Sequence, residues 1–63
     1  MKTIKLTFSL RDWRKGKDVL FRLGHIEEDL LTEEWKLELD DWQIEDLEDE
    51  LNAIDLEFEI EEL

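Results

Sequence analysis

The chain begins with a strictly alternating pattern of apolar and polar residues. Ile4, Leu6, Phe8 and Leu10 are apolar, and the residues between them are polar. Because successive side chains of a β-strand point to opposite faces, this pattern predicts a strand with one buried face. A second apolar segment, residues 19–23, follows after a polar stretch.

Two interpretations fit residues 10–23. A two-residue turn at Lys15-Gly16 would join the two apolar segments as a hairpin, with the inward side chains of both strands on one face. Alternatively, Ser9 and Asp12 resemble a capping box, Gly24 resembles a helix stop, and the segment between them would be helical. A glycine inside a helix costs about 1 kcal/mol, so the glycine of the turn favours the hairpin.

The C-terminal half contains three further elements. Residues 35–39 alternate and predict a strand, after a stretch at 27–34 that is predicted to be a loop or a short helical turn. Apolar residues then recur at spacings of three and four over residues 41–54, which predicts an amphipathic helix whose N-cap is Asp40 or the residue after it. Residues 56–60 alternate again and predict a last strand.

These elements predict a single α+β domain over residues 1–63. Its fold would be a two-layer antiparallel sheet of about four strands, with one main amphipathic helix across the apolar face. If residues 10–23 are helical instead, the order becomes βαββαβ, the ferredoxin-like arrangement. The chain has no cysteine, which excludes a disulfide scaffold and a thiolate zinc site.

The charge is distributed unevenly along the chain. Residues 1–26 contain seven basic and two acidic residues, a net charge of +5, whereas residues 27–63 contain one basic and eighteen acidic residues, a net charge of −17. The acidic half would repel nucleic acid, so the basic residues of the N-terminal half are not expected to bind nucleic acid directly. We expect these bases to neutralise the protein's own acids across strands. In this interpretation Lys5 or Arg11 faces the acids of the last strand, which are Glu57, Glu59 and Glu61.

Candidate catalytic and metal-binding residues are few. His25 is the only histidine and Ser9 the only serine, so a nucleophile with its base would depend on a single pairing. No calcium-loop motif and no glycine-rich phosphate motif occurs. We therefore expect no enzyme activity, no metal and no cofactor. No apolar stretch approaches the roughly 20 residues that span a bilayer, and we expect a cytoplasmic protein that binds no membrane.

The acidic residues of the last helix and the last strand form regular rows. On a helix, carboxylates three or four residues apart have Cβ atoms about 5–6 Å apart, and on a strand, alternate carboxylates are about 6.7 Å apart. Such rows can occupy a protein groove that normally binds a phosphate backbone. The candidate partner-binding residues are Glu45, Glu48, Asp49, Glu57, Glu59 and Glu61. An exposed tryptophan would supply an apolar anchor, and the three candidates are Trp13, Trp35 and Trp42.

In size and composition the chain resembles the small acidic proteins with which phages inhibit host nucleic-acid enzymes, the DNA mimics directed against CRISPR, restriction or repair systems. These proteins are a functional class and not one fold family. The resemblance implies stoichiometric binding to a basic nucleic-acid-binding protein, in the host cytoplasm if the chain is phage-encoded. The alternative is a small acidic protein–protein interaction module, natural or designed, in which the charge serves solubility. A net charge of −12 exceeds the magnitude of about 2–8 that solubility requires, which favours the inhibitor.

Overall fold

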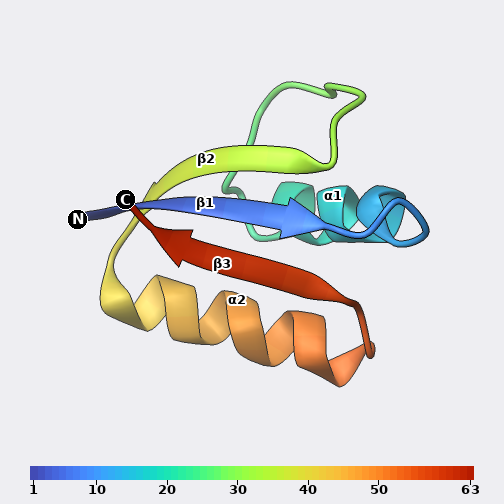
Figure 1. Cartoon of the computed structure of the whole chain (residues 1–63). Helices are drawn as coiled ribbons and strands as arrows, with labels where there is room; N and C mark the ends of the chain where they lie inside the picture. Colours follow the sequence, from blue (N-terminus) through green and yellow to red (C-terminus); the bar gives the residue numbers. More distant parts are fainter.

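Three antiparallel strands form one layer of the structure and two helices form the other (Figure 1). The computed structural model describes all residues, 1–63. In chain order the elements are β1 Lys2–Phe8, α1 Trp13–Arg22, β2 Glu34–Leu39, α2 Asp41–Ala53 and β3 Phe58–Glu62. β1 lies at the centre of the sheet and pairs with β2 on one side and with β3 on the other, antiparallel in both cases. The chain is therefore a small α+β structure.

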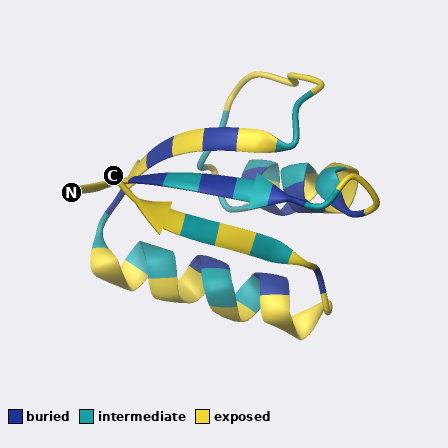
Figure 2. Cartoon of the chain, viewed as in Figure 1, coloured by how far each residue is buried: buried dark blue, intermediate teal, exposed yellow.

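The alternation in β1 separates a buried face of the sheet from an open face (Figure 2). Ile4, Leu6 and Phe8 are buried, whereas Lys5 between them is only half-buried and points to the open face. The predicted strand is confirmed, except that Leu10 lies beyond its end and is exposed. Side chains from both helices and from β2 complete one core. Its other members are Val19, Leu20, Trp35, Leu37, Leu39, Leu47, Leu51 and Leu56.

The predicted hairpin over residues 10–23 is wrong, because most of this segment is the helix α1. The end of α1 is a Schellman motif, which satisfies two of the last carbonyl groups of the helix. His25 N–H donates to Leu20 O at 2.9 Å, and Gly24 N–H donates to Phe21 O at 3.1 Å. Gly24 adopts a φ of +79°, a conformation that other residues adopt only with strain. The helix stop considered for this glycine is confirmed.

Gly16, the residue that favoured the hairpin, is buried where α1 packs on β1. A Cβ atom at this position would overlap the aromatic ring of Phe8. A glycine in the helix interior therefore allows the helix backbone to lie directly against that ring. The conformational cost of the glycine is offset by a close contact that no larger residue permits.

The sheet has three strands and not four. The segment between α1 and β2, residues 23–33, contains no strand, so the ferredoxin-like order βαββαβ is not confirmed either. The structure has the order βαβαβ, and the loop predicted at 27–34 is confirmed up to residue 33. As a consequence β2 and β3 are both edge strands, each paired on one side only.

The predictions for the C-terminal half are largely confirmed. α2 begins after Asp40, whose backbone N–H donates to the side chain of Gln43 at 2.9 Å, as in a capping box. Leu47 and Leu51 are fully buried, but Ile54 is exposed and does not belong to the core. The last strand begins at Phe58, two residues later than the pattern suggested, because a turn after α2 intervenes.

Replacing Gly16 with alanine tests the close packing of α1 on β1. Helix propensity alone predicts a gain of about 1 kcal/mol, whereas overpacking against Phe8 predicts a loss of about 1–3 kcal/mol. We expect the loss, measured as the free energy of unfolding in urea. In a double-mutant cycle, Phe8→Leu should relieve part of the penalty of Gly16→Ala. Strictly additive effects of the two substitutions would contradict the contact.

Replacing Asp55 with glycine should stabilise the fold. α2 ends in the same motif as α1, with Leu56 N–H donating to Leu51 O and Asp55 N–H to Asn52 O, both at 3.1 Å. Here, however, the left-handed position, with φ of 56°, is an aspartate. Glycine should raise the free energy of unfolding by about 1 kcal/mol. Asp55→Ala removes the same charge without relieving the backbone, so an equal gain in this control would refute the explanation.

Candidate partner-binding surface

The six candidate acids form two rows in the structure. Glu45, Glu48 and Asp49 lie on α2 and are named the helix row; Glu57, Glu59 and Glu61 lie on β3 or directly before it and are named the strand row. All of them are exposed except Glu48, which is half-buried. The side chains predicted to meet a partner are therefore accessible to one.

The two rows do not share a face of the sheet. Glu59 and Glu61 alternate with the inward residues Phe58 and Ile60, so their side chains point to the open face, opposite to α2. Glu45 and Glu48 line a hollow between α2 and β3 together with Ile60. The helix row and the strand row consequently flank the free edge of β3, one on each side of it. The six acids therefore do not form one continuous surface.

None of the six acids forms an ion pair within the protein. Seven ion pairs occur, and all of them use other acids: Asp12, Asp29, Glu34, Asp40, Asp41, Glu50 and Glu62. The ammonium group of Lys2 contacts Asp41 at 2.9 Å and Glu62 at 3.4 Å. The hydrogen bond to Asp41, followed by that to Glu62, raises the pKa of Lys2 above its usual value.

The expected pairing of bases with the strand row is not found. Lys5 lies opposite Glu61 in the register of β1 and β3, but its ammonium group contacts Glu34 on β2 at 2.8 Å. This hydrogen bond to Glu34 raises the pKa of Lys5. Arg11 approaches Asp12 at 3.8 Å and none of the acids of β3. The strand row therefore keeps its charge uncompensated by direct contacts.

One of the three tryptophans is exposed. Trp35 is buried in the core at 6% exposure, and Trp13 is half-buried, with Arg14 and Lys17 each 5.3 Å from the centre of its ring. Trp42, in the first turn of α2, is 63% exposed. On a helix, the residue three positions after Trp42 lies on the same side, and this residue is Glu45. Trp42 is thus the one exposed tryptophan, and it lies on the same helix as the helix row.

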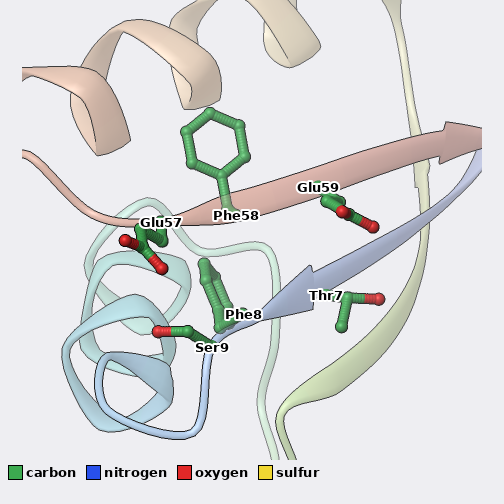
Figure 3. Close-up of a pocket in the computed structure, with 6 residues that line it drawn as sticks. All are labelled: Thr7, Phe8, Ser9, Glu57, Phe58 and Glu59. Atoms are coloured by element: carbon green, nitrogen blue, oxygen red, sulfur yellow. The ribbon is translucent and has the colours of Figure 1, made fainter.

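Asp12 is the one buried acid of the chain, and the sequence pattern did not indicate its tertiary contacts. It is 6% exposed and its Oδ2 accepts hydrogen bonds from Ser9 Oγ at 3.4 Å and from Glu57 N–H at 3.3 Å. Ser9 and Glu57 also line a shallow hollow at the end of the β1–β3 pair (Figure 3). Asp12 therefore ties the start of the strand row to the segment before α1.

The His, Asp and Glu side chains of the chain do not gather into a metal site. No group of three His, Cys, Asp or Glu side chains is placed to hold a metal ion. His25 is half-buried, and this burial lowers its pKa. Ser9 hydrogen-bonds to Asp12 and not to the histidine.

No family model, no curated protein and no solved structure matches the chain. None of the helices is long and apolar enough to cross a membrane.

The unpaired acids predict that salt stabilises the protein. Exposed carboxylates repel one another over distances that salt screens, about 10 Å at 0.1 M, whereas the exposed ion pairs contribute little that screening can remove. The melting temperature should rise between about 10 mM and 500 mM NaCl. A variant with Glu45→Gln and Asp49→Asn should show a smaller rise. A flat or falling melting temperature in the wild type would mean that the acids are already compensated.

Proposed function

We propose that the protein binds the basic nucleic-acid-binding groove of a partner protein, in a fixed ratio and without turnover. The helix row and the strand row take the places of phosphate groups in that groove. The observation that carries the proposal is that all six acids are unpaired, while other acids of the chain form all the internal ion pairs.

The spacing within each row supports the proposal. In ideal strand geometry, alternate residues such as Glu59 and Glu61 repeat about every 6.7 Å, a spacing comparable with that of neighbouring phosphates on one nucleic-acid strand. The helix and the strand hold the backbone of these residues in place before binding, so little backbone entropy is lost on association. The charges are thus arranged for electrostatic complementarity with a cationic groove.

The position of Trp42 supports binding at the helix row in particular. Charged groups determine the rate and the specificity of association more than its free energy, whereas buried aromatic side chains dominate the free energy of most interfaces. An exposed tryptophan beside Glu45 gives the helix row an apolar contact in addition to charge.

Charge reversal with competition by nucleic acid tests the proposal. The partner is first recovered by a pull-down from a nuclease-rich lysate and then titrated with purified wild type and variants. Lysine substitutions at the three residues of either row should weaken binding about tenfold or more, since each triple variant changes the net charge by six. Binding should also weaken as salt rises, and duplex DNA or RNA should displace the protein.

The matched control reverses Arg14 and Lys15, exposed bases on α1 with no ion pair. This variant should bind at least as tightly as the wild type. Circular dichroism and thermal melting must show that all variants remain folded, which is expected because exposed charges change stability by under about 0.5 kcal/mol each. If both acidic triples keep wild-type affinity, or if nucleic acid joins the complex without displacing the protein, the acids serve solubility and the protein is an interaction module of another kind.

A further inference from the structure

The free edge of β3 presents unpaired backbone groups beside the two acidic rows. Two hydrogen bonds lie at the ends of the ladder between β1 and β3. Ser9 N–H donates to Glu57 O at 3.4 Å, and Leu63 N–H donates to Thr3 O at 2.9 Å. In an antiparallel ladder, directly opposite pairs alternate between bonded and non-bonded. The N–H and C=O groups of Phe58, Ile60 and Glu62 therefore point outward from the sheet.

The side chains next to this edge are incompletely covered. Phe58 and Ile60 point toward the core side of the sheet but are only half-buried, because no strand lies beyond β3. Figure 3 shows the ring of Phe58 directed toward the helix layer. Ile60 lines the hollow between β3 and α2 together with Ile44, and Glu45 and Glu48 lie around these two residues. A strand added at this edge would bury apolar surface.

The free edge of β2 differs from that of β3 in its uncovered apolar surface and in its charge. Its inward side chains, Trp35, Leu37 and Leu39, are already buried, so an added strand would cover no further apolar surface there. On its open side Lys36 is placed among the acids, whereas the open side of β3 contains only glutamates. Both apolar surface and charge therefore favour the edge of β3 as the binding edge.

We propose that the edge of β3 binds an extended segment of the partner, in which apolar residues alternate with lysine or arginine, as a fourth strand of the sheet. The apolar side chains would cover Phe58 and Ile60, and the basic side chains would meet Glu59 and Glu61 on the open face. The choice of a basic partner rests on the proposed function. A second copy of this chain is disfavoured, because each copy has a net charge of −12.

A synthetic peptide of alternating lysine and valine, matched in length to β3 and blocked at both ends, is the probe. Fluorescence anisotropy at low salt should show saturable binding, and a peptide of the same composition with its lysines and valines in two blocks should bind about tenfold more weakly or worse. N-methylation of one alternate set of peptide nitrogens should weaken binding about tenfold or more, and N-methylation of the other set should change it by less than about twofold. Equal effects of the two sets, or equal binding of the block peptide, would contradict strand addition.

Proline at position 62 tests the edge from the protein side. Glu62 lies in a non-bonded pair with Ile4, so Glu62→Pro removes an outward N–H group and keeps the ladder to β1. It should weaken peptide binding about fivefold or more relative to Glu62→Ala, which removes the same carboxylate and the same ion pair with Lys2. Equal affinities of these two folded variants would overturn the proposal.

The two proposals fail separately. If acidic reversals and nucleic-acid competition abolish binding of the partner while Glu62→Pro and N-methylation have no effect, the groove mimic stands and the edge proposal is refuted. If the edge variants abolish binding of the peptide while nucleic acid does not displace the partner, the edge proposal stands and the mimic is refuted.

Discussion

The contact between Gly16 and the ring of Phe8 determines how the two layers meet. It is the point at which the backbone of α1 lies against the central strand, and any side chain at position 16 would force the layers apart. The core depends on this placement, because Val19 and Leu20 of the same helix pack into it. A domain of this size buries only about 60% of its surface on folding, so it has little stability in reserve to tolerate a displaced helix.

Local patterns predicted what local forces determine. The alternation in β1 and β2 and the three-and-four spacing in α2 each depend on burying one side of a single element. All three elements form, although Leu10 lies beyond the end of β1 and Ile54 beyond the end of α2. Residues 10–23 satisfied both a hairpin and a helix. The decision depends on Phe8, which is distant from Gly16 in sequence and adjacent in space, and single-sequence propensity could register only the cost of the glycine.

The candidate site shows the same limit. The sequence pattern placed Glu45, Glu48 and Asp49 on one helix and Glu59 and Glu61 on one strand, and both elements form, because each depends on burying one side of a single element. Whether the two rows share a face of the sheet depends on which face α2 packs against, and the packing of α2 is determined by tertiary contacts. Likewise, the hydrogen bond from Glu57 N–H to Asp12 spans 45 residues, and no local pattern could have revealed it. Which tryptophan is exposed follows from packing, since Trp35 and Trp42 are both on elements with a buried side.

The acids beside β3 also bear on whether a sheet with free edges can pair with a second copy of itself. An unpaired edge is a template for pairing with another chain, and charged residues along it are a common protection. If two copies met edge to edge at β3, glutamates would lie opposite glutamates on the open face in any antiparallel register. The reason is that the alternate positions on this face, Glu57, Glu59 and Glu61, contain no other residue type. Like charges directly opposite destabilise such a pair, whereas an alternating basic strand replaces that repulsion by attraction. The charge that opposes pairing between two copies at this edge is therefore the same charge that would select a basic strand, and the half-buried Phe58 and Ile60 would give that strand apolar surface to cover.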